Sequence, residues 1–233
     1  MPAAITTITT TTTMSTDAGA LLRLLAWLSP GFPTGGYAYS HGLEWAVEAG
    51  ELHDGETLRI WIEDLLWHGS GWSDAILLRH AHAAANDVDG LAAIVEFALA
   101  AAPCRERYLE TIGQGNAFVA AAASWFPELL ARIGDVPYSV AVGALAGAHG
   151  IDADAACAGL LQAFSTNLIS AAVRLVPLGQ SAGLAVLAAL QPTIIAVTDK
   201  SRGANLEDLG SACFRSDLAA MRHETQYTRL FRS

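Results

Sequence analysis

The chain has 233 residues, of which 52% are hydrophobic, and its formal net charge is -10. A chain of this length can bury a core without disulfides, and its alanine- and leucine-rich segments favour helix over strand. The negative charge argues against nucleic acid or an acidic membrane surface as a general partner.

Residues 1–16 are mostly threonine with few large apolar groups. Such a segment cannot bury enough apolar surface to offset the entropy lost on ordering, so we expect a disordered leader. Apolar positions beyond it recur at helical spacing, which predicts one all-α domain over residues 17–233, a bundle of about ten helices. The predicted helices cover residues 18–28, 39–49, 54–67, 73–86, 88–101, 105–123, 137–149, 152–175, 180–190, 192–198 and 206–220, with a short one opened by Pro127.

The segment 152–175 has the clearest helical pattern. Leu161, Leu168 and Leu175 belong to an apolar stripe, and a polar stripe lies opposite, because positions two apart on a helix point about 200° from each other. The polar stripe is unusually hydrophilic for so apolar a chain, and we interpret it as the lining of a water-filled passage or a subunit seam. Its residues are Gln162, Thr166, Asn167, Ser170 and Arg174.

The run from Leu175 to Thr198 is uncharged and long enough to suggest a membrane span. Two prolines and two glutamines interrupt it, so we expect two buried helices joined by turns, and no membrane association. Cys104, Cys157 and Cys213 lie far apart, and no signal peptide is evident. These features favour a reducing, cytoplasmic location.

The polar residues form no recognisable nucleotide or metal motif. Lys200 is the only lysine and follows no glycine-rich loop, which argues against a P-loop nucleotide site. The segment 69–71 (Gly-Ser-Gly) lacks the nucleophile-elbow pattern, and we interpret it as a helix-ending turn. His80 and His82 would face nearly opposite sides of one helix, so solvated or core histidines are the simpler interpretation.

Glu44 and Glu48 share a face of one predicted helix. They could form an acid–base pair, but a solvated helical face is the default interpretation. No nucleophile–base pair is evident, which makes a helical hydrolase the weakest function class. The sequence therefore predicts a protein that is not an enzyme, with no catalytic residue, no metal ligands and no stably bound cofactor.

Two segments are too rich in aromatic and special residues for plain core. Residues 32–44 combine paired glycines with phenylalanine and two tyrosines. This pattern is typical of either a helix-entry turn with buried tyrosines or an aromatic-rich binding edge. Residues 221–233 carry arginines together with Tyr227, Leu230 and Phe231. Because tyrosine and arginine often anchor interfaces, this tail either folds back onto its own core or docks on a partner.

At these segments the chain resembles the urease accessory protein UreF family. The matching stretches are Pro33–Trp45, Asn167–Gln180 and His223–Ser233, in the family's order and spacing. The resemblance implies an all-α, non-enzymatic homodimer that binds the accessory protein UreD (also called UreH) and the GTPase UreG. It further implies docking of that complex on apo-urease and support of nickel insertion, with nickel, GTP and CO2 used by the partner complex.

Carried over by position, the resemblance implies that the tail orders on binding UreD and forms much of that contact, because its apolar side chains would gain burial only under a partner. We therefore expect removal of residues 222–233 to leave the helical body nearly intact. A helical metal- or small-ligand-binding protein remains the alternative. The expected partner-binding residues are Arg222, His223, Glu224, Tyr227, Arg229, Leu230, Phe231 and Arg232 in the tail, with Tyr37, Tyr39, Ser40 and Glu44 as a second surface.

Overall fold

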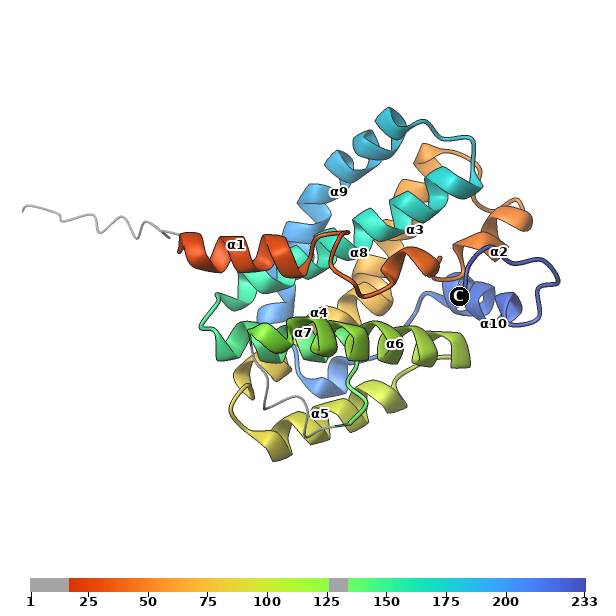
Figure 1. The fold of residues 1–233 in the computed structure, drawn as a ribbon. Coiled ribbons are helices and arrows are strands. Elements are labelled where there is room, and N and C mark those ends of the chain that lie inside the picture. Colours follow the sequence, from red (N-terminus) through yellow and green to blue (C-terminus); the bar gives the residue numbers. More distant parts are fainter. Residues whose placement is uncertain (1–16, 126–133) are drawn as a thin grey trace, which may run out of the picture.

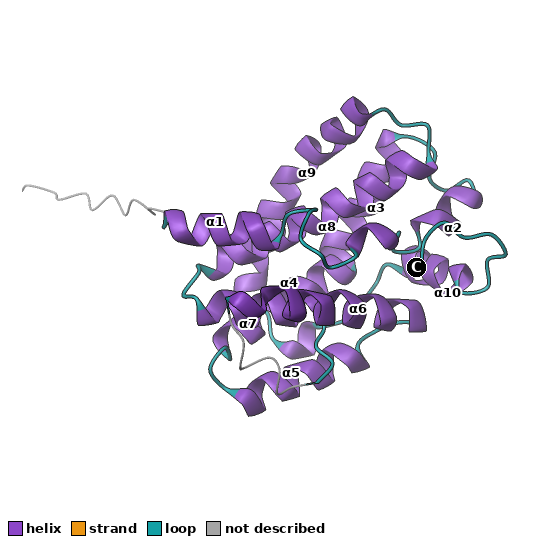
Figure 2. Cartoon of the chain, viewed as in Figure 1, coloured by secondary structure: helices purple, strands orange, loops and turns teal. Residues whose placement is uncertain are grey.

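The computed structural model describes residues 17–125 and 134–233. The threonine-rich leader and the short helix expected after Pro127 both lie outside the described residues. Within the described residues there are ten α-helices and no strand, so the all-α prediction is confirmed (Figure 2).

Short turns join most of the helices between α2 and α6, whereas residues 28–42 and 201–213 form longer connections (Figure 1). Several begin at a side chain that accepts a backbone N–H, as Asp17, Asp54 and Asp152 do. The helices are α1 Ala18–Trp27, α2 Leu43–Glu48, α3 Gly55–His68, α4 Ser70–Ala83, α5 Val88–Ala100, α6 Arg105–Ala121, α7 Tyr138–Ala148, α8 Ala153–Leu175, α9 Gln180–Lys200 and α10 Phe214–His223.

Helices α4 and α7 form the most closely packed pair in the core. A Cβ atom added at Gly143 of α7 would lie 2.2 Å from the carbonyl oxygen of Leu78, and one at Gly147 would lie 2.3 Å from that of His82. Only glycine permits this approach, so the two helix backbones are in direct contact. One contiguous apolar core surrounds them and includes Trp27, which is fully buried.

Helices α8 and α9 are each long and apolar enough to cross a membrane by length and composition. Both pack in the fold, with α9 lying along α3 and α8 (Figure 1). Leu161 and Leu168 of α8, and Leu190 and Val197 of α9, belong to the protein core. Packing against protein therefore accounts for the inner face of each helix, whereas Leu184 and Ile195 on the outer face of α9 are exposed.

Three predicted helix boundaries were wrong. The separate helices expected over 180–190 and 192–198 form the single helix α9, because Pro192 removes only one backbone N–H and the flanking turns are held by packing. Helix α4 begins at Ser70, directly after Gly69, and not at Ser73. The last helix begins at Phe214, because residues 206–208 form only a 3-10 turn and Gly210 has φ +152°.

The predicted helix 39–49 is also shorter than expected. A 3-10 turn covers Gly36–Ala38, and α2 begins only at Leu43. His41 and Gly42 both have positive φ, which interrupts the helix. At Gly42 a Cβ atom would lie 2.8 Å from the backbone nitrogen of Ala220, so glycine lets α10 pack against this turn.

Candidate partner-docking site

The two segments singled out in the sequence lie against each other. The backbone N–H of Arg232 donates to the carbonyl of Ala38 at 2.8 Å, and the N–H of Ser40 donates to the carbonyl of Ser233 at 2.7 Å. The Ser40 hydroxyl also bonds that carbonyl. The carboxyl end of the described chain therefore lies beside α2 and α10 (Figure 1), and the two expected surfaces form one site.

The side-chain carboxylate of Glu44 binds the backbone of the tail. One carboxylate oxygen accepts the N–H of Leu230 at 2.7 Å, and the other accepts the N–H of Phe231 at 3.0 Å. Glu44 is 6% exposed, so the default expectation of a solvated face was wrong for this residue, whereas Glu48 is exposed. Because the bonds go to main-chain groups, the tail backbone is fixed whatever side chains it carries.

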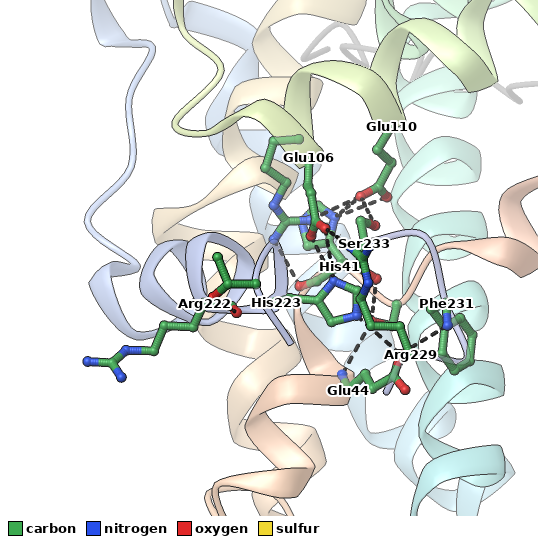
Figure 3. Close-up of polar contacts among 12 residues, drawn as sticks. His41, Glu44, Glu106, Glu110, Arg222, His223, Arg229, Phe231 and Ser233 are labelled. Carbon is green, nitrogen blue, oxygen red and sulfur yellow. Dashed lines mark hydrogen bonds and ion pairs between the residues drawn. The ribbon is translucent and has the colours of Figure 1, made fainter. Parts of the chain in front are cut away.

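His223 lies between two carboxylates and is fully buried (Figure 3). Its Nδ1 lies 2.8 Å from Glu106 and its Nε2 lies 3.1 Å from Glu44. An imidazolium satisfies both contacts with N–H donors, whereas a neutral ring satisfies only one. Arg229 adds an ion pair to Glu106 at 3.1 Å, and burial raises the pKa of the Glu106 carboxyl.

A second buried carboxylate, Glu110, lies one helical turn along α6. It accepts a hydrogen bond from the Ser233 hydroxyl at 2.9 Å and pairs with Arg107 at 3.4 Å. Burial raises the pKa of Glu110 and lowers that of Arg107 to about 10. The tail and α6 are therefore joined through two acidic side chains four residues apart.

Other tail side chains point into solvent. Tyr227 is 102% exposed and Leu230 is 75% exposed. Arg222 points away from the cluster (Figure 3), with its guanidinium 5.4 Å from the ring centroid of Trp45. On α10, the large apolar side chains of Phe214, Leu218 and Met221 are also exposed and follow one another at helical spacing. These residues make an apolar surface edged by arginine.

The structure corrects the expectation that every apolar tail side chain waits for a partner. Phe231 is 5% exposed within the chain itself, and the Arg174 guanidinium lies 4.3 Å from its ring centroid. Removal of residues 222–233 would uncover Glu44, Glu106 and Glu110, so the contacts argue against a nearly intact body after truncation, a prediction that remains to be tested. Of the second expected surface, Tyr37 is exposed whereas Tyr39 and Ser40 are buried.

The polar stripe of α8 faces a cavity of about 1010 Å³. Helices α1, α4, α6 and α8 line it, and Gln162, Thr166, Asn167 and Ser170 are on its wall. Arg174 instead donates to the carbonyl of Tyr37 at 2.9 Å, which ties α8 to the docking site. Asp74 also lines the cavity, and burial raises its pKa to about 7.

Two histidines of α4 have backbone partners outside this cluster. His80 and His82 bond the carbonyl oxygens of Ala204 and Ile151 at 3.2 and 2.7 Å, consistent with their interpretation as non-ligand histidines. Within residues 17–125 and 134–233, no group of three His, Cys, Asp or Glu side chains could hold a metal ion.

Sequence reasoning missed one pairing of a hydroxyl with a base. Ser70 Oγ lies 2.6 Å from His41 Nε2, although 29 positions separate the two residues. It also missed Glu106 and Glu110, whose i, i+4 spacing on an otherwise ordinary helix gives no sign of a distant partner. The apolar spacing of Phe214, Leu218 and Met221 could have been read from the sequence.

The sequence of this chain is similar to those of known proteins. The sequence model of the UreF family matches residues 52–191. A protein of Bradyrhizobium sp. (strain ORS 278), named urease accessory protein UreF, is 51% identical over 224 residues, 93% of each chain. Relatives of the same name from Rhodopseudomonas palustris (strain BisB18) and Methylobacterium sp. (strain 4-46) are 49% and 50% identical, over 93% and 91% of this chain and 93% and 88% of theirs.

Proposed function

Because this chain belongs to the UreF family of urease accessory proteins, we propose that it joins UreD (UreH) to the GTPase UreG during urease maturation. The chain is an accessory protein, from a family not known to be catalytic, and is not an enzyme. In the proposed complex it regulates GTP hydrolysis by UreG and supports nickel insertion into apo-urease. Nickel, GTP and CO2 are then used by the complex and are not stably bound by this chain.

The observation that carries the proposal is the geometry of the tail. Its backbone is tied to the body through Glu44, yet Tyr227 and Leu230 extend into solvent. A large apolar side chain on a fixed backbone loses little further entropy when a partner covers it, so such residues are efficient anchors. We assign UreD to this surface.

The exposed face of α10 extends the same surface. Phe214, Leu218 and Met221 add apolar area, and Arg215 and Arg222 flank them on the same helix. A partner that fits this surface carries an apolar groove edged by carboxylates.

The cavity beside α8 supports a route for a small polar solute through the complex. Gln162, Asn167 and Ser170 offer neutral hydrogen-bonding groups along one side of a wall that also carries Asp74 and Glu110. Neutral ligands of this kind hold a hydrated cation weakly, which suits passage better than storage. We propose that the polar stripe of α8 lines this route.

We also propose a cytoplasmic homodimer. Helix α1 exposes Leu21, Leu22 and Leu25, and Leu184 of α9 is exposed as well. Exposed apolar groups of this number on a chain with net charge -10 are typical of a protein–protein contact and do not fit nucleic acid.

Co-purification tests the proposal directly. The full-length chain is expressed with UreD and UreG, and the expected result is one complex containing all three proteins. A chain that copurifies with neither contradicts the proposal. The cavity favours the alternative, a helical metal- or small-ligand-binding protein, and tight stoichiometric nickel binding by the isolated chain in calorimetry would support that alternative instead.

A further inference from the structure

Ser70 has the hydrogen-bond partners of an activated nucleophile. Its Oγ lies 2.6 Å from Nε2 of His41, and Nδ1 of His41 lies 3.2 Å from both carboxylate oxygens of Glu110. A neutral His41 with its proton on Nδ1 donates to Glu110 and accepts from the Ser70 hydroxyl. This is the serine–histidine–carboxylate connectivity in which the imidazole removes the hydroxyl proton as the oxygen attacks.

The fold holds His41 in an unfavourable conformation. Its φ of +61° lies in the left-handed region, which a residue with a Cβ atom adopts at a cost in free energy. Arg107 donates to its backbone carbonyl at 3.0 Å, and the ring packs edge-on against Phe164 with centroids 5.1 Å apart. The imidazole is thus held between Ser70 and Glu110 by contacts from α6 and α8.

The turn that carries Ser70 is equally constrained. Ser70 is the first residue of the 14-residue helix α4, and no side chain caps this helix start. A Cβ atom added at Gly71 would lie 2.9 Å from Cα of Leu66, so the turn packs tightly against α3. The first N–H groups of a helix have no partner within it, and the start of a helix favours negative charge.

Ser70 and His41 both line the cavity of about 1010 Å³. The remainder of the wall is largely apolar and includes Leu77, Leu160 and Leu187. An aliphatic chain is the chemical group that such a wall accommodates. The site therefore combines an activated hydroxyl with space for an acyl chain.

We propose that Ser70 accepts an acyl group from an activated acyl ester whose aliphatic chain occupies this cavity. Ser70 Oγ attacks the carbonyl carbon and forms the new C–O bond, and its proton passes to His41 Nε2. The bond to the leaving alkoxide or thiolate breaks, and the proton on His41 passes to that leaving group. The product is one acyl-serine per chain without turnover.

A tagged alkyl fluorophosphonate probes this reactivity on the purified full-length chain. The Ser70 oxygen forms a bond to phosphorus, the phosphorus–fluorine bond breaks, and fluoride leaves with the hydroxyl proton. Intact mass is expected to rise by one adduct, and peptide mapping is expected to place it on Ser70. With a 4-nitrophenyl alkanoate, one equivalent of nitrophenolate is expected, followed by no further release.

Ser73 provides the matched comparison within the same molecule. It also lines the cavity, but its hydroxyl donates to the carbonyl of Gly210 at 3.1 Å. Ser70→Ala should abolish labelling, Ser73→Ala should leave it unchanged, and His41→Asn should slow it about 100-fold, because asparagine tolerates positive φ but supplies no base. The proposal is overturned if wild-type Ser70 reacts no faster than Ser73, or if His41→Asn reacts at the wild-type rate while retaining the wild-type circular dichroism.

Discussion

Nε2 of His223 lies 3.1 Å from a carboxylate oxygen of Glu44, although 179 positions separate the two residues. The same carboxylate accepts the N–H groups of Leu230 and Phe231, so one glutamate fixes both the end of α10 and the tail that follows it. The inner side of the tail is already bound to the body of the protein, so we propose that a partner docks on its outer side.

Glu44→Ala should destabilise the chain by about 3 kcal/mol, because the substitution leaves Nε2 of His223 and the backbone N–H groups of Leu230 and Phe231 without their acceptor. Chemical denaturation followed by circular dichroism measures this loss. Trypsin should also cleave after Arg222 and Arg229 faster in the variant than in the wild type. Glu96→Gln, on an exposed position of α5, is the matched control and should change stability by less than about 0.5 kcal/mol.

Phe231→Ala should cost about 3 kcal/mol of stability, since the buried ring is lost and a cavity remains beneath Arg174. Phe97→Ala, which removes a half-exposed ring from α5, should cost much less. Thermal and chemical denaturation of both variants make the comparison. Equal stability of the two variants would contradict the packing of Phe231 described above.

Asp74→Asn should stabilise the chain at pH 8 but not at pH 4. The folded pKa of Asp74 is raised by burial to about 7 from a reference value of 3.8, so its favourable contribution is present below pH 3.8 and is lost as pH rises toward 7. The full shift corresponds to about 4 kcal/mol, and we expect about 2 because the side chain is only partly buried. Unfolding free energies across this range test the sign, and a gain at pH 4 equal to that at pH 8 would contradict it.

Gln162→Leu should lower nickel-dependent urease activation several-fold in cells while leaving co-purification with UreD and UreG unchanged, because it removes a polar group from the cavity wall. Gln191→Leu is the matched control, since Gln191 is exposed on α9. Arg174→Ala should also impair activation, through loss of its bond to Tyr37. Unchanged activation in both Gln162→Leu and Arg174→Ala would contradict the proposed route.

The sequence was sufficient for features that local patterns determine. The apolar spacing predicted a helix over 152–175, and the structure has α8 at Ala153–Leu175. Proline, by contrast, was given too much weight at Pro192, because periodicity carries no information on the packing that holds α9 together on both sides of it.

Contacts between distant segments explain what sequence reasoning missed. Glu106 and Glu110 lie on α6, and the tail groups that they bind are 117 to 123 positions away. Burial of His223 and Phe231 depends on these contacts and on the turn at Gly42. The sequence of residues 221–233 alone contains no sign of them, so it suggested a tail whose apolar side chains are buried only by a partner. The sequence singled out residues 32–44 and 221–233 as candidate binding segments. Only the structure shows that these two segments contact each other.

The central claim is that the outer side of the tail is the docking surface for UreD. The most direct test is the affinity for UreD, measured by calorimetry for the full-length chain and for the double variant Tyr227→Ala/Leu230→Ala. Both side chains extend into solvent, so the account predicts an unchanged unfolding midpoint together with affinity weakened by about 100-fold or more. Wild-type affinity in the folded double variant would contradict the claim that the outer side of the tail is the docking surface.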